Sequence, residues 1–257
     1  MSPSTQPSPD HARERIATVE HWYHRIEVAP GVITPGINDS PGSLALLPLP
    51  DDCSGLRVLD IGARDGFFSF EAERRGAEVL AMDYMPAEQT GFAVARELLG
   101  SNVEYVVDNV YALSEERYGR FDVVLFLGVL YHLRNPLLAL DRIWSVCGDQ
   151  LIMETAVLDN ALLGPDGEFH SLGQAAPGAH SVPLAQFYPA DTLNGDFTNW
   201  WSPNMACLRG LLESACFDVI DTTLHGARGI AHARRSEDPQ RLYWRRLDSS
   251  ASVELAG

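Results

Sequence analysis

Between residues 56 and 156 the chain alternates short β-branched runs with longer amphipathic ones. The alternation predicts strands separated by helices. Such strands need crossover connections, which make the sheet parallel and cover both of its faces with helices, so we expect a doubly wound α/β fold. The expected strands are Leu56–Ile61, Glu78–Asp83, Val103–Asp108, Phe121–Phe126 and Gln150–Thr155, and the expected helices are Phe67–Arg75, Ala87–Leu99 and Leu137–Val146.

The remaining residues divide into a cover, an insert and the end of the sheet. Polar residues 1–14 and 248–257 are expected to be mobile. Residues 15–50 begin with a predicted helix over 15–27 and continue as a Gly/Pro-rich segment covering the active site. The main domain spans 51–247, with an irregular insert at 157–203 that is typical of a functional lid. A helix at Asn204–Ala215, a strand at Phe217–Leu224 and an antiparallel strand over 241–247 complete the prediction.

Composition narrows the choice of partner. The 257 residues are 46% apolar and 21% charged, as in globular proteins, and acidic residues outnumber basic ones by 35 to 19. Every basic residue is an arginine, and the formal net charge is −16. This charge opposes the phosphate contacts through which nucleic acids are bound, so a small-molecule substrate is favoured. The four cysteines lack zinc or disulfide spacing, and no signal-like or membrane-spanning run is visible, so a cytoplasmic protein is expected. The sequence assigns no metal ligands and leaves metal dependence open.

The motif VLDIGARDGFF at 58–68 carries the strongest chemical signal. A strand ends near Asp60, and a turn with Gly62 and Gly66 leads into a helix whose N-terminus can face a ligand. The spacing is not the G-x-G-x-x-G of dinucleotide sites, which argues against a nicotinamide dehydrogenase. A carboxylate two residues before the first glycine suits a cationic group better than a pyrophosphate.

Two more aspartates end the next two predicted strands. Asp83 follows Asp60 by 23 residues, a position from which a carboxylate can bind both hydroxyls of a ribose. Asp108 can reach an exocyclic amine. Together the three carboxylates predict a site for a nucleoside with a positively charged attachment.

At these residues the sequence resembles the class I S-adenosylmethionine-dependent methyltransferases, over 56–156 and less specifically over 203–246. Their loop reads D-x-G-x-G-x-G, and here Arg64 replaces the middle glycine. The resemblance implies a mostly parallel seven-stranded sheet, with S-adenosylmethionine as cofactor and S-adenosylhomocysteine as product. It places the methionine moiety at Asp60 and Gly62 and the ribose at Asp83. The other residues expected at the cofactor are Ala63, Arg64, Gly66, Tyr84, Asp108, Asn109, Val110, Leu127 and Gly128.

A second likeness lies in FDVVLFLGVLYHLRNPLLAL at 121–140. Its G-V-L-Y-H-x-x-x-P block resembles the tRNA wobble-uridine carboxymethyltransferases, which implies that Tyr131 lies beside the transferable group. WYHRIEVAPGVITPG, F-Y-P at 187–189 and NWWSPN at 199–204 are similar to a bacterial branch of that superfamily. Members of the tRNA family use a lysine near the cofactor carboxylate, and this chain has none.

Two histidines are candidate general bases for a hydroxyl acceptor. His132 follows the fourth strand at the carboxyl edge of the sheet, and histidine titrates near neutral pH. It also suits a capping role for the next helix. His24, the rival, is expected on the N-terminal helix beside Trp22 and Tyr23, which can serve as acceptor contacts or as anchors of that helix.

The acceptor is expected to contact residues after the fifth strand and around the end of the insert. These are Glu154, Trp200, Trp201 and Asn204, of which one tryptophan can shape a pocket for a flat or sugar-like molecule. Arg134 and Arg228 are typical of solvated surface, although either could bind a substrate carboxylate.

Three functions therefore stay open. The favoured one is methylation of a small molecule, at an oxygen of a natural-product or sugar-like acceptor, with histidine as the base. The alternatives are an RNA-modifying enzyme like the tRNA wobble-uridine family and a non-catalytic protein that binds S-adenosylmethionine. The sequence predicts no membrane partner and leaves the oligomeric state open.

Overall fold

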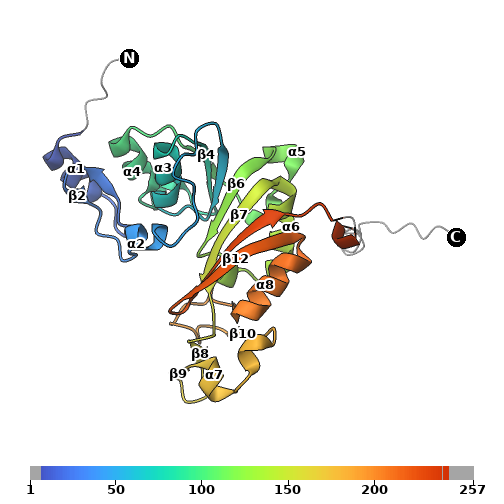
Figure 1. Ribbon diagram of the computed structural model, residues 1–257. Helices are drawn as coiled ribbons and strands as arrows, with labels where there is room; N and C mark the ends of the chain where they lie inside the picture. Colours follow the sequence, from blue (N-terminus) through green and yellow to red (C-terminus); the bar gives the residue numbers. More distant parts are fainter. Residues whose placement is uncertain (1–6, 239, 243–257) are drawn as a thin grey trace. The chain divides into compact units, whose positions relative to one another are not determined.

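The computed structural model describes residues 7–238 and 240–242. The chain forms two compact units. Unit 1 comprises residues up to Ala112 together with Phe121–Phe126, and unit 2 comprises Leu113–Arg120 and the residues from Leu127 onward. Seven strands follow the order β12-β13-β7-β6-β3-β4-β5 in one sheet, and Figure 1 labels most of them.

The strands that unit 1 contributes to this sheet are all parallel, as the crossover pattern predicts. Strand β3 pairs with β4 and with β6, and β4 pairs with β5. The bounds are Arg57–Ile61 for β3, Glu78–Asp83 for β4, Glu104–Val107 for β5 and Phe121–Leu127 for β6. Helix α3 (Phe67–Arg74) packs on β3 and β4, and the core of the unit includes the fully buried Leu59, Phe92, Phe121 and Phe126.

The predicted helix over 87–99 is divided in two. A 3₁₀ turn η1 covers Ala87–Gln89, and α4 covers Phe92–Leu99. Gly91 lies between them, and a Cβ there would collide with the ring of Trp22. The helix is interrupted at Thr90, whose backbone is extended at φ −123° and ψ −177°. A second 3₁₀ turn, η2 (Val110–Ala112), ends this part of unit 1.

The N-terminal segment differs from its prediction. Helix α1 runs over Pro9–Ile16, where mobility up to residue 14 was expected, because Ser8 caps it and Pro9 occupies its first turn. The prediction of a helix over 15–27 is wrong beyond Ile16. Residues 22–24 belong to no helix, and His24 forms an isolated bridge with Asn38. Strands β1 (Glu27–Ala29) and β2 (Val32–Ile33) and helix α2 (Ser40–Leu44) complete the segment.

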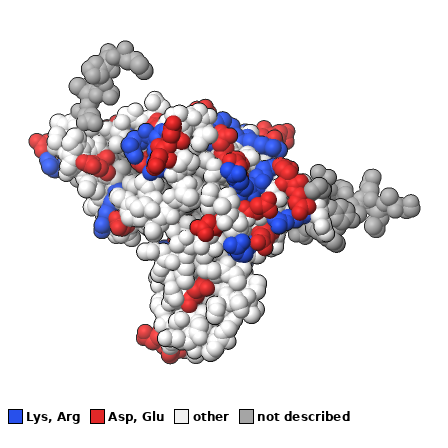
Figure 2. All heavy atoms as spheres, viewed as in Figure 1, with Lys and Arg blue, Asp and Glu red and all other residues white. Residues whose placement is uncertain are grey.

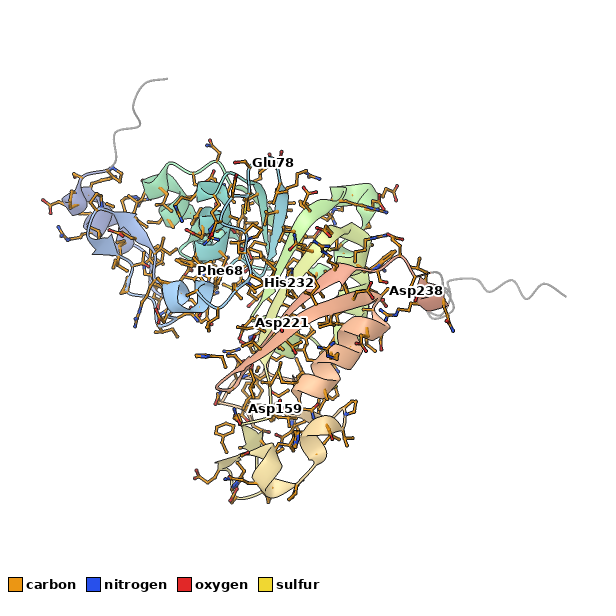
Figure 3. The ribbon with its side chains drawn as sticks, viewed as in Figure 1. Phe68, Glu78, Asp159, Asp221, His232 and Asp238 are labelled. Carbon is orange, nitrogen blue, oxygen red and sulfur yellow. The ribbon has the colours of Figure 1, made fainter. Side chains whose placement is uncertain are left out.

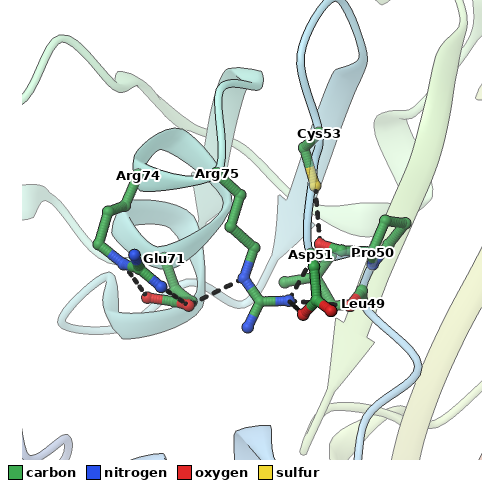
Figure 4. A network of polar contacts seen from close by, with 7 residues as sticks. All are labelled: Leu49, Pro50, Asp51, Cys53, Glu71, Arg74 and Arg75. Carbon is green, nitrogen blue, oxygen red and sulfur yellow. Dashed lines mark hydrogen bonds and ion pairs between the residues drawn. The ribbon is translucent and has the colours of Figure 1, made fainter.

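The entry into β3 is fixed by the guanidinium of Arg75, at the end of α3 (Figure 4). This group donates to the carbonyls of Leu49 and Pro50 at 2.8 and 3.0 Å and to the carboxylate of Glu71 at 2.8 Å. The backbone N–H of Cys53 in turn donates to the Arg75 carbonyl at 2.8 Å. These bonds fix the chain where it enters the strand that leads to the Asp60 turn.

Unit 2 carries the antiparallel part of the sheet. Strand β13 (Arg228–Arg235) pairs antiparallel with β7 (Cys147–Ala156) and with β12 (Phe217–His225). The sequence predicts this antiparallel strand at 241–247, and the structure corrects its position to 228–235. The described part of the predicted run, Arg241 and Leu242, is helical, and residues 243–247 lie outside the described residues. Helices α6 (Pro136–Val146) and α8 (Met205–Ser214) confirm their predictions, and α8 packs on β12 (Figure 1). Helix α5 (Glu115–Tyr118) and the 3₁₀ turn η3 (Leu130–His132) also belong to this unit.

The insert at 157–203 has little regular structure, as its composition predicts. Its elements are β8 (Leu162–Leu163), β9 (Phe169–His170), α7 (Leu172–Ala175), η4 (Ala179–Ser181), β10 (Ala185–Phe187) and β11 (Trp201–Pro203). It contains no lysine or arginine, and Figure 2 shows few charged side chains over α7, β8 and β9. Asp159, labelled in Figure 3, ties the insert to α8 by accepting from the N–H of Met205 at 2.9 Å. In the described part of the chain no helix is long and apolar enough to cross a membrane.

Candidate functional site

The carboxylate of Asp60 lies at the end of β3 and is 2% exposed as a residue. The hydroxyl of Ser69, on the first turns of α3, donates to it at 2.6 Å. Burial raises the pKa of Asp60 to about 6, and the nearby carboxylate of Asp83 adds to this rise. A buried carboxyl group in this state gains from a cation beside it, so Asp60 suits the positively charged ligand predicted from the sequence.

The turn after β3 is held by backbone hydrogen bonds and contains three left-handed residues, Gly62, Arg64 and Gly66. The N–H groups of Gly62 and Ala63 donate to the carbonyl of Met82 on β4. Arg64 has a φ of +52°, a conformation that favours glycine, and its N–H donates to Asp83 at 2.9 Å. The hydrogen bond to Asp83 supports Arg64 in this backbone conformation, at the position where class I methyltransferases have a glycine.

Gly66 starts α3 with a φ of +90°. A Cβ at this position would lie 2.6 Å from the ring of Phe70 and 2.7 Å from that of Phe92. Glycine is therefore required here by backbone conformation and by close packing.

Asp60, Asp83 and Asp108 lie at or directly beyond the carboxyl ends of three neighbouring parallel strands. The N–H of Asp108 donates to the Asp83 carbonyl at 2.9 Å, so these two residues are adjacent. Asp83 is 5% exposed, and its carboxylate also accepts from the N–H of Met85 at 3.0 Å. The residues beside them differ: Tyr84 is 73% exposed, Asn109 is exposed, and Val110 is buried.

Asp65, which sequence reasoning did not select, joins the N-terminal segment to the turn. Its fully buried carboxylate accepts from the N–H groups of Tyr23 at 2.6 Å, His24 at 2.8 Å and Gly91 at 2.9 Å. The run A-R-D-G contained the signal, because a polar side chain that precedes a left-handed glycine can bond backbone amides. Its partners, up to 42 residues away, could not be read from the sequence.

His24 is buried against the turn, at 4% exposure. Its ring meets that of Phe68, labelled in Figure 3, edge to face with centroids 5.6 Å apart. Burial lowers the pKa of His24 to about 4, so the ring is neutral at physiological pH. Among the described residues Nδ1 has no hydrogen-bond partner. A buried polar atom without a partner fits a polar ligand group, which makes this turn compatible with a bound cofactor.

In unit 2, His132 is held by the insert. Its Nδ1 lies 3.2 Å from the Thr198 carbonyl and 2.9 Å from the Thr198 hydroxyl. That hydroxyl donates its proton to Asp196 at 2.6 Å, so it must accept from His132. The proton of the neutral ring therefore sits on Nδ1, and Nε2 keeps the lone pair. Burial lowers the pKa of His132, which favours this neutral form.

Tyr131, Glu154 and Arg228 form a second cluster in unit 2. The Arg228 guanidinium lies 5.2 Å from the Tyr131 ring centroid and pairs with the Glu154 carboxylate at 3.3 Å. Burial raises the pKa of Glu154, and Arg228 opposes this rise. At the end of β6, a Cβ on Gly128 would lie 3.8 Å from both the Glu154 carboxylate and the Tyr131 hydroxyl, while Leu127 is half-buried.

A pocket of about 300 Å³ opens between the start of α6 and the end of the insert. The Phe187 and Trp200 rings are nearly parallel, at 23°, and Phe187 lies 4.8 Å from the Trp201 ring. The N–H of Trp200 donates to the Tyr131 carbonyl at 2.8 Å, which joins the pocket to the His132 segment. The lining residues are Arg134, Asn135, Phe187, Trp200 and Trp201.

Two predicted acceptor contacts, Asn204 and Trp22, make structural contacts within the protein. Asn204 is fully buried and caps α8 by accepting from Cys207 N–H at 2.8 Å, and its amide donates to Val182 at 2.7 Å. Trp22 is 7% exposed and donates to the Ile16 carbonyl at 3.1 Å. Both side chains are occupied within the protein.

Phe187, Thr198 and Asp196 were not selected as site residues from the sequence. Phe187 belongs to the quoted F-Y-P run, which was a usable signal. Thr198 and Asp196 sit in an irregular segment with no periodicity, so only the fold brings them to His132. In the described ranges no cluster of three or more His, Cys, Asp or Glu side chains is arranged to hold a metal ion.

The sheet order and the turn after β3 together define the fold of a class I S-adenosylmethionine-dependent methyltransferase. A family described as "Methyltransferase domain" matches residues 34–200. The chain belongs to this methyltransferase family.

Relatives within the family differ in their acceptors. The tRNA U34 carboxymethyltransferase of Dichelobacter nodosus (strain VCS1703A) is 29% identical over 185 residues, 68% of this chain and 52% of that protein. The magnesium-protoporphyrin O-methyltransferase of Rhodobacter capsulatus is 32% identical over 99 residues, 38% of this chain and 43% of that protein. The chain thus spans about half the length or less of these curated relatives.

Among solved structures, the N-terminal domain of EvdMO1, crystallised in the presence of SAH and D-fucose, is similar with a TM-score of 0.62. It is 20% identical, and the match covers 91% of this chain and 98% of that one. At this identity the likeness supports the fold.

Proposed function

We propose that this methyltransferase methylates a hydroxyl group of a small, ring-shaped molecule, with His132 as the general base. The observation that carries the proposal is the hydrogen-bonded series from His132 through Thr198 to Asp196, on the same chain segments as the aromatic pocket. The EvdMO1 domain, crystallised in the presence of a sugar, supports a sugar-like acceptor.

The residues of unit 1 fit the cofactor by the chemistry of their side chains. Asp60 suits a cationic group, Asp83 and Asp108 suit hydroxyl and amine donors, and the unpartnered Nδ1 of His24 suits a further polar group. S-adenosylmethionine would supply a methyl group on a positively charged sulfur. His24 then belongs to the cofactor side, because its pKa of about 4 makes it a weak base.

His132 has the properties of a base that receives the acceptor proton. Its Nδ1 proton is fixed by Thr198, so Nε2 can accept a proton from a hydroxyl while the ring gains a positive charge. Asp196, bonded to the same threonine, stabilises that charge. General base catalysis of this kind typically contributes about 10²- to 10⁴-fold in rate.

The test is release of S-adenosylhomocysteine with a panel of hydroxylated ring compounds, including D-fucose. We expect H132N to lower kcat by about 100-fold with the affinity for S-adenosylmethionine unchanged. His170, an exposed histidine of the insert, provides the matched control, and H170Q should retain full activity. Turnover by H132N above one-tenth of wild type would contradict the role of His132.

A tRNA substrate is the second candidate, favoured by the relatives that carry that name. Members of that family use a lysine near the cofactor carboxylate, and this chain has none. Arg228, beside Tyr131, offers a cation in its place, although Glu154 pairs with it. The absence of any arginine or lysine from the insert opposes RNA binding there. Filter binding at low salt separates the two: sub-micromolar affinity for tRNA would replace the small-molecule proposal.

A further inference from the structure

Arg134 lines the pocket, and among the described residues no carboxylate forms an ion pair with it. Its guanidinium lies 5.0 Å from the Trp200 ring centroid. Two other arginines of unit 2 pair with a carboxylate: Arg228 with Glu154 and Arg234 with Asp149, each at 3.3 Å. In a chain with 35 acidic and 19 basic residues, most arginines easily find a carboxylate. Arg134 therefore retains its hydrogen-bond donors for a ligand.

The surroundings of Arg134 add a second feature that favours an anion. Helix α6 starts at Pro136, directly after Asn135. Asn135 also lines the pocket, so the positive end of an 11-residue helix lies at the pocket wall. Backbone N–H groups and the helix dipole at such an end favour a negative charge.

The other walls favour a ring. Phe187, Trp200 and Trp201 present three aromatic side chains, with Phe187 49% exposed. A volume of about 300 Å³ is at the small end of ligand pockets and suits one or two rings. Arg134 alone is charged among the five lining side chains.

The geometry points to an acceptor that carries a carboxylate on its ring, with Arg134 binding the carboxylate and the aromatic residues contacting the ring. This inference rests on the proposed function, which makes the pocket the acceptor site, and it adds the charge of the acceptor. A guanidinium binds a carboxylate through two parallel hydrogen bonds, which a neutral amide cannot reproduce.

The test measures binding by calorimetry and by quenching of tryptophan fluorescence, without turnover. Two matched pairs of probes distinguish a flat ring from a sugar: 4-hydroxybenzoate with 4-hydroxybenzamide, and D-glucuronate with D-glucose. In at least one pair we expect the carboxylate to bind about tenfold more tightly than its neutral partner, as a charge-assisted hydrogen bond allows. R134Q should abolish this preference while leaving the affinity of the neutral probe unchanged, and R134K should restore part of it.

Arg142 provides the control, because it is an exposed arginine on the same helix that does not line the pocket. R142Q should keep the tenfold preference. Equal binding within both pairs, a preference that survives in R134Q, or no binding of either carboxylate at about 10 mM would each overturn the inference. Failure to bind at this concentration would mean a Kd weaker than about 10 mM, which is too weak for a substrate-binding contact.

The proposed function can fail separately. H132N should bind the carboxylate probe as wild type does. If that preference depends on Arg134 but no ring hydroxyl is methylated in a His132-dependent way, the anion site stands and the proposed reaction falls. If ring compounds are methylated with full dependence on His132 but carboxylated rings are not preferred over their neutral partners, the reaction stands and the inference falls.

Discussion

The turn after β3 in unit 1 and the insert of unit 2 are both irregular, yet they are held in different ways. In the turn, the buried carboxylate of Asp65 accepts hydrogen bonds from backbone N–H groups, and a Cβ at Gly66 would collide with two phenylalanines. In the insert, apolar side chains remain in solvent, with Phe169 52% and Phe197 66% exposed. A loop held by close packing can bind one cofactor with little variation, whereas an insert with spare surface can accommodate different acceptors.

The sharpest test of this comparison replaces a glycine in each region. G66A should destabilise the protein by about 3 kcal/mol or more, because alanine is strained at a φ of +90° and overpacks against Phe70 and Phe92. Gly178 of the insert has a φ of +85° but no atom within 4 Å of the position that a Cβ would take, so G178A should cost about 1 kcal/mol. Urea denaturation followed by circular dichroism measures both.

A second glycine of unit 1 tests whether the cost of G66A comes from its packing or only from its location in unit 1. Gly31 has a φ of +70° and open space around its Cβ position. G31A should therefore resemble G178A in stability. If G66A cost no more than these two, close packing would not be what distinguishes the turn from the insert.

The parallel strands of unit 1 could be predicted from the sequence because each is a short, largely apolar run, and three of them have an aspartate at or next to their carboxyl end. The same pattern located Asp60, Asp83 and Asp108, whose placement depends only on where strands end. Asp65 and Thr198 could not be found in this way, because their partners are brought to them by the fold. The helix predicted over 15–27 failed because the chain there is fixed by Asp65 rather than by its own periodicity.

The second prediction concerns the charge of the turn. The affinity for S-adenosylmethionine should fall about tenfold from pH 7.5 to pH 5, because Asp60 is protonated below its pKa of about 6 and then no longer attracts a cation. In D60N the affinity should be low and nearly independent of pH, whereas D39N, at an exposed cap of α2, should behave as wild type. Calorimetric titration measures the affinity for S-adenosylmethionine across this pH range. An affinity of the wild-type protein that does not change with pH would exclude Asp60 as the partner of the cation.

The same group has an opposite effect on stability. The pKa of Asp60 is higher in the folded protein than its ordinary value of 3.8, so its contribution to stability is complete below that value and is lost as the pH rises through about 6. D60N should consequently be as stable as wild type or more stable at pH 7.5. A variant that gains stability while losing cofactor affinity would mark the turn as shaped for binding at the expense of stability.

The smallest expected effect belongs to the insert. Thr198 contacts His132 only through a hydroxyl and a carbonyl, and T198V removes the hydroxyl while leaving the carbonyl acceptor at 3.2 Å. We expect kcat to fall about fivefold with KM little changed, since the tautomer is then less firmly held and the hydrogen-bonded link from His132 to Asp196 is lost. T198S keeps the hydroxyl and should restore kcat. A purely structural role of Thr198 would leave the pH profile of kcat unchanged in T198V, whereas a role in orienting the base should shift the pH dependence of His132, because one of the two groups that accept its Nδ1 proton is gone. The insert would then contribute to the chemistry as well as to the choice of acceptor, and the contrast with the tightly packed turn would be one of packing alone.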